Sequence, residues 1–301
     1  MKLAICDPID AKAMDELKKL GLEVLDLSSI EKDQLKEHVK DADILVVRSA
    51  TKVKGDLLNA LESAKLIIRG GVGLDNIDLE GAKKKGIKVV NTPEASSISV
   101  AELVFAHIFA IYRHIVRGTL GIKEGKWEKK ALKGNELYGK TIGIIGMGRI
   151  GREVAKRAKA FGMNVIGYDV VDFPEEFAEK VSLDELYERS DIITLHVPLI
   201  PQTKHMINSA SISKMKDGVV IINCSRGGVV NEEDLYKYLK NGKVKGAGLD
   251  VFEHEPPEKS PLFELDNVVF TPHIGASTKE AQSRIGVEIV KKVKAFLEGN
   301  L

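Results

Sequence analysis

Short apolar runs alternate with amphipathic stretches along the first third of the chain. The apolar runs predict strands over residues 2–6, 23–27, 44–47, 66–69 and 88–90. The stretches between them predict helices over residues 11–20, 32–39, 55–61 and 79–85. Near-continuous apolar strands that alternate with helices are typical of a parallel sheet covered on both faces. We therefore expect one doubly wound unit, which ends near Pro93, since proline disfavours helix at the residue before it.

A long apolar helix and a second alternating series follow. Ser96 or Ser97 can cap a helix reaching residue 117, whose apolar circumference predicts burial between domains or subunits. A passage rich in Gly and Lys, residues 118–139, contains the single Trp, Trp127. Further strands are predicted over residues 141–145, 164–168, 191–195, 218–223, 245–249 and 267–270, and a closing helix over residues 278–297.

Composition supports two domains and excludes a broadly basic protein, although a local basic patch remains open. At about 150 residues per domain, 301 residues favour two domains, each with its own core. With 45 basic and 44 acidic side chains, the net charge of +1 gives no general reason to expect nucleic acid or a membrane as partner. Two cysteines in apolar runs favour a reducing compartment, with the cytoplasm as the default. The apolar run after Lys2 is too short for a signal peptide.

A glycine motif with a specific context predicts a dinucleotide site. The predicted strand at 141–145 leads into Gly146-Met-Gly148-Arg-Ile-Gly151 and then into a helical pattern over 152–161. Gly146 and Gly148 allow a tight turn and close approach to a pyrophosphate, and Gly151 allows close helix–strand packing. The motif means little without this context, because glycine is common, with 27 in the chain.

Asp169 ends the next predicted strand, where a carboxylate can bind the adenosine ribose hydroxyls. Val170 and Val171 follow it, with no arginine to receive a 2′-phosphate, so we expect NAD rather than NADP. The alternative is a structural turn in which Asp169 caps a helix.

Three further polar patches follow predicted strands, at residues 223–228, 249–257 and 271–278. Ligands of parallel sheets bind outside the carboxyl ends of strands, so these patches can converge on the reactive end of the cofactor. Together with the glycine motif, and in the same order, they resemble the D-isomer-specific 2-hydroxyacid dehydrogenase family over nearly the whole chain.

This resemblance implies three catalytic residues. Arg226 would bind the carboxylate and carbonyl of the substrate, and His273 would be the acid/base, paired with Glu255. The chemistry is sound, since hydride loss from an alcohol carbon needs a base, and imidazole titrates near neutrality. Glu253 and Glu258 are rival carboxylates that only the family pattern excludes. Arg226 can also be read as a surface ion-pair partner.

The same resemblance assigns the rest of the cofactor and substrate contacts. The cofactor-binding residues would be Val72, Gly146, Gly148, Arg149, Ile150, Gly151, Asp169, Val197, Cys224, Ser225, Arg226, Asp250, His273, Gly275 and Ala276. The loops after residues 47 and 69 resemble those of the phosphoglycerate dehydrogenases of the family. They imply substrate contacts from Arg48, Ser49, Arg69, Gly70 and Gly71, with Lys129 adding charge, and solvated surface cations are the alternative reading.

We thus expect an α/β protein of two doubly wound parallel-sheet domains. A Rossmann NAD-binding domain, residues 98–284, would be inserted into a flavodoxin-like substrate domain, residues 1–97 and 285–301, with hinges near 92–99 and 276–285. The resemblance implies a homodimer without metal, in a short form lacking a regulatory domain.

The activity that the resemblance implies is NAD-dependent oxidation of D-3-phosphoglycerate to 3-phosphohydroxypyruvate, the entry to serine synthesis. A glyoxylate or hydroxypyruvate reductase, or another D-2-hydroxyacid dehydrogenase, is an alternative. An NAD-sensing interaction protein, like the corepressors built on this fold, is another. Formate dehydrogenases fit less well, because they pair their histidine with Gln where this chain has Glu255.

Overall fold

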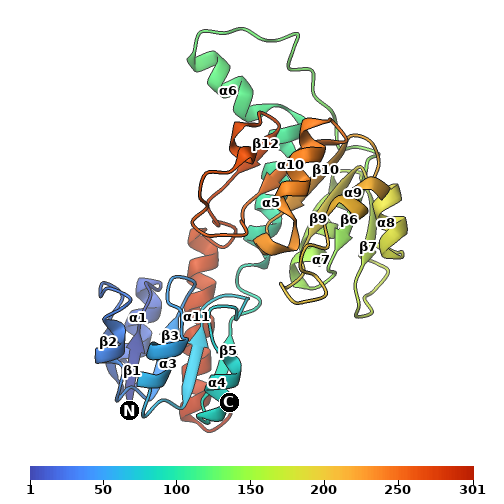
Figure 1. Ribbon diagram of the computed structural model, residues 1–301. Coiled ribbons are helices and arrows are strands. Elements are labelled where there is room, and N and C mark those ends of the chain that lie inside the picture. The colour runs from blue at the N-terminus through green and yellow to red at the C-terminus, as the bar shows by residue number, and fades with distance from the viewer. The chain divides into compact units, whose positions relative to one another are not determined.

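The computed structural model describes residues 1–301, which form two compact units. One comprises Met1–Ser97 and Ala276–Leu301, and the other Ile98–Gly275 (Figure 1). The chain returns to the first unit at Ala276, whereas we expected residue 285. The reason is local: Thr278 caps the last helix, α11 (Lys279–Leu297), by accepting the amide of Ala281, so the whole helix stays in one unit.

The first unit is built on a five-stranded parallel sheet in the order β2-β1-β3-β4-β5. Its strands are β1 (Lys2–Ile5), β2 (Glu23–Asp26), β3 (Ile44–Val47), β4 (Leu66–Arg69) and β5 (Lys88–Asn91). The strand order reverses between β1 and β3, and parallel sheets bind their ligands at such a point.

Helices cover both faces of this sheet. On one face, α1 (Ala11–Lys18) and α11 enclose a core that includes Leu17 and Ile289. On the other, α2 (Leu35–His38), α3 (Gly55–Ala60) and α4 (Leu79–Lys84) enclose a second core that includes Leu35 and Leu58. This arrangement explains why β3, the central strand of the sheet, is apolar along its whole length.

The second unit contains a seven-stranded sheet in the order β12-β11-β10-β9-β6-β7-β8, again parallel throughout. Its strands are β6 (Thr141–Ile145), β7 (Asn164–Tyr168), β8 (Glu179–Lys180), β9 (Ile192–Leu195), β10 (Val219–Asn223), β11 (Val244–Leu249) and β12 (Val268–Phe270). The order reverses between β6 and β9, directly beside the glycine motif. The predicted fold class, α/β with two doubly wound parallel sheets, is confirmed.

Two cores flank the second sheet. On one face, α5 (Ser97–Tyr112) and α7 (Arg149–Ala160) pack residues such as Ile108 and Val154 against it. On the other face lie α8 (Leu183–Arg189), α9 (Ser209–Lys214) and α10 (Glu232–Lys240), together with the short 3-10 helices η1 (Gly227–Val229) and η2 (Pro261–Glu264). The sequence did not predict β8, which is only two exposed residues long.

The single helix predicted over residues 97–117 is wrong. Helix α5 ends at Tyr112, and α6 (Ile115–Lys123) begins after a bend of 61°. His114 lies between them with φ +52, a left-handed conformation that ends a helix. Much of the apolar surface of α5 is buried in the core of its own unit. No single helix has the length and apolar character needed to cross a membrane; only the bent pair α5 and α6 meets that test jointly.

Candidate active site

The glycine motif forms a tight turn between β6 and α7. Gly146 has φ +97, and a Cβ there would lie 2.4 Å from the carbonyl oxygen of His196, at the end of β9. A Cβ on Gly151 would lie 2.1 Å from the carbonyl oxygen of Gly146, so only glycine lets α7 approach the strand this closely. A Cβ on Gly148 would meet nothing within 4 Å. The space beside the N-terminus of α7 is therefore open to an anion.

Asp169 fixes the other side of this turn. Its carboxylate follows β7 and accepts the amide N–H of Met147, inside the glycine motif, at 2.6 Å, and that of Val171 at 3.0 Å. The carboxylate and the glycine turn are thus held together, as a pyrophosphate and the neighbouring ribose require. The turn, the open space and the carboxylate fit a dinucleotide.

His273 and Glu255 form a direct pair. The imidazole Nδ1 lies 2.7 Å from Oε2 of Glu255, and 41% of the His273 side chain is exposed. Oε1 of the same carboxylate accepts the amide of Phe252 at 3.2 Å, which fixes the carboxylate plane. Glu253 instead lies 3.2 Å from His205, so the geometry distinguishes Glu253 from Glu255.

The electrostatics of Glu255 favour its ionised form. Partial burial alone raises the pKa of its carboxyl, but the hydrogen bond and charge of His273, the Phe252 amide and the charge of Arg226 outweigh this. The pKa of Glu255 therefore lies below its ordinary value. Such a carboxylate stays negative at neutral pH, orients the imidazole and stabilises its protonated form.

Arg226 is half-buried and follows β10, at the start of η1. Its Nη1 donates to the carbonyl of Ser225 at 2.6 Å, and its own carbonyl accepts from the side-chain amide of Asn223 at 2.9 Å. Gly227 must follow, because a Cβ there would lie 1.9 Å from the carbonyl of Phe252. Arg226, Glu255 and His273 thus all lie in the second unit, on segments that leave the carboxyl ends of β10, β11 and β12.

Asp250 holds the segment that carries His273. Its carboxylate, 1% exposed, accepts the Thr271 hydroxyl at 2.5 Å and the amides of Ile274 and Gly275 at 2.8 Å each. Its carbonyl accepts the amide of His273, also at 2.8 Å. These bonds hold His273 at φ +52, which histidine seldom adopts.

Thr271 is in turn fixed by a buried histidine on α5. Nε2 of His107 lies 3.0 Å from the Thr271 hydroxyl, whose proton points to Asp250. His107 therefore donates from Nε2, and burial lowers the pKa of its imidazole. Sequence reasoning did not single out His107 or Thr271, because only the tertiary structure brings them to Asp250.

The other expected cofactor residues of this unit lie at or near the same strand ends. Val197 follows β9, Cys224 and Ser225 follow β10, Gly275 ends the unit, and Arg149 and Ile150 begin α7. Burial raises the pKa of the Cys224 thiol well above its usual range, so the thiol is not a nucleophile at neutral pH. Burial also lowers the pKa of His196 to about 3, which excludes that histidine as an acid/base near neutral pH.

The expected substrate residues lie mainly in the first unit. Arg48 and Ser49 follow β3, and Arg69, Gly70, Gly71 and Val72 lie at the end of β4 and directly after it. Gly71 has φ +144, and a Cβ there would collide with the Arg69 guanidinium. Ala276, expected at the cofactor, also belongs to this unit. Lys129 lies in the second unit on the exposed segment after α6, not at a strand end.

Known proteins are similar to this chain in sequence and in fold. The family profile described as "D-isomer specific 2-hydroxyacid dehydrogenase, NAD binding domain" matches residues 105–275. The chain belongs to the D-isomer specific 2-hydroxyacid dehydrogenase family. The family acts on small hydroxy and oxo acids, and this chain is an NAD-dependent member of it.

Individual relatives support this assignment. The chain is 54% identical to a hydroxypyruvate reductase of Thermotoga maritima, over 97% of each chain. It is 50% identical to a D-3-phosphoglycerate dehydrogenase of Methanocaldococcus jannaschii, covering 100% of this chain but only 58% of that relative's length. Among solved structures, a D-lactate dehydrogenase of Aquifex aeolicus, complexed with NAD and lactic acid, has a TM-score of 0.86 and 38% identity, covering 100% of this chain and 96% of that one.

Proposed function

We propose that this chain catalyses NAD-dependent oxidation of D-3-phosphoglycerate to 3-phosphohydroxypyruvate, and the reverse reaction. We choose a phosphorylated acid because Arg48, which follows β3, is partly buried and lacks a hydrogen-bond partner for its Nε. Its guanidinium is half-buried, and its buried Nε donates to no group of the protein. Burial lowers the pKa of Arg48, but a guanidinium stays charged, so an anion such as phosphate would restore the lost solvation.

The proposed chemistry uses the three polar residues of the second unit. NAD, when bound, accepts or returns the hydride. His273 takes the proton of the substrate hydroxyl during oxidation and returns it during reduction. Glu255 stabilises the imidazolium that forms, and Arg226 binds the substrate carboxylate and polarises its carbonyl. The 2.7 Å pairing of His273 with Glu255 supports this assignment.

The proposed cofactor contacts follow the glycine turn and the strand ends. Arg149 and Ile150 would meet the pyrophosphate, and Asp169 the ribose hydroxyls. Val197, Cys224, Ser225 and Asp250 would lie along the nicotinamide half, with Val72, Gly275 and Ala276 completing the site. Ser49, Arg69, the backbone of Gly70 and Gly71, and Lys129 are the proposed additional substrate contacts.

Hydroxypyruvate reduction is the second candidate function. It is favoured by the 54% identity to the T. maritima hydroxypyruvate reductase, which also matches this chain along 97% of its own length. This chain covers only 58% of the length of the phosphoglycerate dehydrogenase relative, so the similarity alone does not assign that relative's substrate to this chain.

A homodimer is part of the proposal. Helix α6 and the segment after it extend away from the sheet of their unit (Figure 1). They carry apolar side chains in solvent, among them Leu120 at 53%, Ile122 at 58% and Trp127 at 80% exposure. Apolar surface of this kind favours association with a second copy.

A substrate panel with the purified protein tests the function. We expect NADH-dependent reduction of 3-phosphohydroxypyruvate with a kcat/KM at least about 10-fold above that of hydroxypyruvate, since a phosphate–arginine contact is a charge-assisted hydrogen bond. Equal or higher kcat/KM with hydroxypyruvate or glyoxylate would favour the second candidate. Negligible turnover with every acid, together with stable protein partners in a pull-down, would favour the interaction protein.

A further inference from the structure

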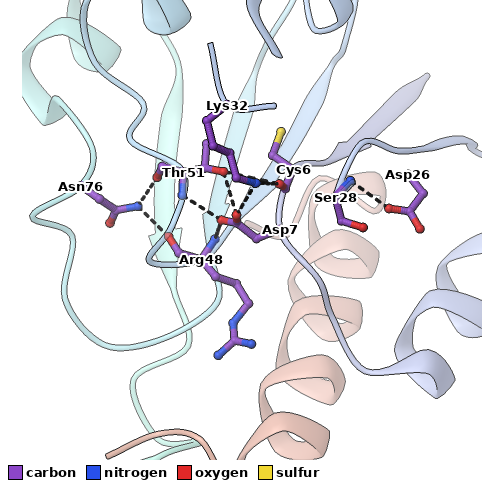
Figure 2. Close-up of polar contacts among 8 residues, drawn as sticks. All are labelled: Cys6, Asp7, Asp26, Ser28, Lys32, Arg48, Thr51 and Asn76. Atoms are coloured by element: carbon purple, nitrogen blue, oxygen red, sulfur yellow. Dashed lines mark hydrogen bonds and ion pairs between the residues drawn. The ribbon is translucent and has the colours of Figure 1, made fainter. Parts of the chain in front are cut away.

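A buried carboxylate at the end of β1 has all its hydrogen-bonding capacity in use. Asp7 is 1% exposed, and its Oδ2 accepts the amides of Arg48 at 2.6 Å and Thr51 at 3.2 Å. Its Oδ1 accepts the Thr51 hydroxyl at 2.8 Å and the ammonium of Lys32 at 2.9 Å (Figure 2). Burial alone raises the pKa of Asp7, but these bonds outweigh burial and leave the pKa below its ordinary value. Asp7 is therefore a permanent anion at neutral pH.

Asn76 binds the same segment through its carbonyl groups. Its side-chain amide donates to the carbonyls of Arg48 and Thr51 at 2.7 Å each. Asp7 thus accepts hydrogen bonds from the backbone amides of Arg48 and Thr51, the two ends of residues 48–51. Asn76 donates hydrogen bonds to the carbonyls of the same two residues (Figure 2). The backbone of this segment is fixed by side chains at both ends, although it belongs to no helix or strand.

The segment lies where a ligand site is expected. It leaves the carboxyl end of β3, next to β1, at the point where the strand order of the first sheet reverses. Figure 2 shows the Arg48 side chain extending away from Asp7, so the carboxylate holds the Arg48 backbone and leaves its guanidinium for another partner. The guanidinium is also oriented by Gln282 on α11, which accepts from its Nη1.

We propose that Asp7 is the positioning residue of the substrate-binding segment 48–51. By fixing the backbone at Arg48, the carboxylate aims a partly desolvated guanidinium at the substrate anion before the substrate arrives. A preorganised site loses less entropy on binding, so the effect of Asp7 falls on substrate affinity. The hydride and proton transfers depend on residues of the second unit and are not affected. This inference rests on the proposed function, because it assigns the substrate anion to Arg48.

The Asp7→Asn variant tests the proposal, because it keeps the volume of the side chain but replaces one acceptor with an NH₂ group. That group faces backbone N–H donors or the Lys32 ammonium, so some bonds to the segment or to Lys32 must break. The assay uses the 2-oxo acid that the wild type reduces with the highest kcat/KM. We expect its KM to rise about 10-fold, with kcat within about threefold and the KM for NADH unchanged.

Asp26→Asn is the matched control. Asp26 ends β2 in the same sheet, is exposed, and accepts one backbone amide, that of Ser28, at 3.1 Å (Figure 2). It does not bond residues 48–51, so all three kinetic constants should match the wild type. Circular dichroism and thermal unfolding report whether each variant is folded under assay conditions.

A milder pair covers the case in which Asp7→Asn does not fold. Thr51→Val puts a methyl group in place of the hydroxyl that donates to Asp7 at 2.8 Å and to the carbonyl of Cys6 at 3.4 Å, while Thr51→Ser keeps the hydroxyl. We expect Thr51→Val to raise the substrate KM about threefold and Thr51→Ser to restore it.

Two outcomes would overturn the proposal. One is a folded Asp7→Asn or Thr51→Val protein with lower thermal stability but wild-type KM, which would make Asp7 a purely structural residue. The other is a loss confined to kcat or to NADH affinity. Failure of the proposed function looks different, because it appears in the wild type as a preference for an unphosphorylated acid. The role of Asp7 is then tested by comparing the KM of Asp7→Asn for that unphosphorylated acid with the KM of the wild type.

Discussion

The pairing of His273 with Glu255 depends on a backbone conformation that histidine seldom adopts. The left-handed φ of +52 is stabilised by the hydrogen bonds that Asp250 makes to residues 271–275. Strain of this kind costs about 1–3 kcal/mol and clusters at functional sites. The pair therefore depends on its supporting bonds as much as on the two side chains.

His273→Ala removes the group that we propose takes the substrate proton. We expect kcat to fall by at least about 100-fold, while NADH still binds, because the glycine turn and Asp169 are untouched. Steady-state kinetics and fluorescence titration with NADH measure the two effects. His254→Ala is the control, since His254 is exposed and next to Glu255 in sequence. A near-normal kcat in His273→Ala would reject the acid/base assignment.

Asp169 sets the expected preference for NAD, because its carboxylate repels a 2′-phosphate. Asp169→Ala should lower the ratio of kcat/KM for NAD to that for NADP by about 10-fold. Asp172→Ala is the comparison: Asp172 is exposed, lies three residues further along the chain and pairs with Lys180 at 2.6 Å. If the ratio is unchanged in Asp169→Ala, the Asp169 carboxylate does not bind the ribose hydroxyls of the cofactor.

At this scale, sequence patterns could propose site residues only where the residue type and the motif agreed. Glu253, Glu255 and Glu258 cannot be distinguished by charge or spacing, and the structure separates Glu253 from Glu255 by the direction of each side chain. Asp7, Asn76 and His107 carry no local signal, because their partners are 25 to 164 residues away.

At the scale of elements, the turn from β6 to α7 separates two roles of glycine. A Cβ on Gly151 would overlap the backbone of the turn, whereas a Cβ on Gly148 would enter open space. Packing therefore requires glycine at 151, and only a ligand would require it at 148.

These two roles predict different effects of an alanine substitution at each glycine. Gly151→Ala should lower the free energy of unfolding by roughly 1–3 kcal/mol, because the backbone must move to admit the methyl group. Gly148→Ala should leave the unfolding temperature unchanged and weaken NADH binding about 10-fold, since the methyl group occupies the space proposed for the pyrophosphate. Thermal unfolding and NADH titration of both variants check this. If Gly148→Ala binds NADH like the wild type, the pyrophosphate lies elsewhere.

Most strands and helices were predicted because alternating apolar runs and helical periodicity dominate this sequence. Strands β3, β4, β6 and β7 have the predicted bounds. The break between α5 and α6 was not predicted, since neither proline nor glycine marks it and the residue that adopts the left-handed conformation there is a histidine, His114. The backbone conformation of such a residue is determined by tertiary packing and not by local propensity.

At the scale of the whole molecule, the proposed dimer depends on the exposed apolar surface of α6 and the segment after it. Replacing Leu120 and Ile122 together by Asp should convert a dimer into a monomer, because buried carboxylates at an interface are strongly unfavourable. Sedimentation velocity of the wild type and the double variant measures this. A monomeric wild type, or a double variant that remains dimeric, would contradict the proposal.

The central claim is that Arg48 selects a phosphorylated 2-oxo acid as the substrate. The most direct measurement is the ratio of kcat/KM for 3-phosphohydroxypyruvate to that for hydroxypyruvate, in the wild type and in Arg48→Ala. We predict a high ratio in the wild type that falls about 10-fold or more in Arg48→Ala, mostly through the KM of the phosphorylated acid. A wild-type ratio near one, or a ratio that Arg48→Ala leaves unchanged, would contradict the account.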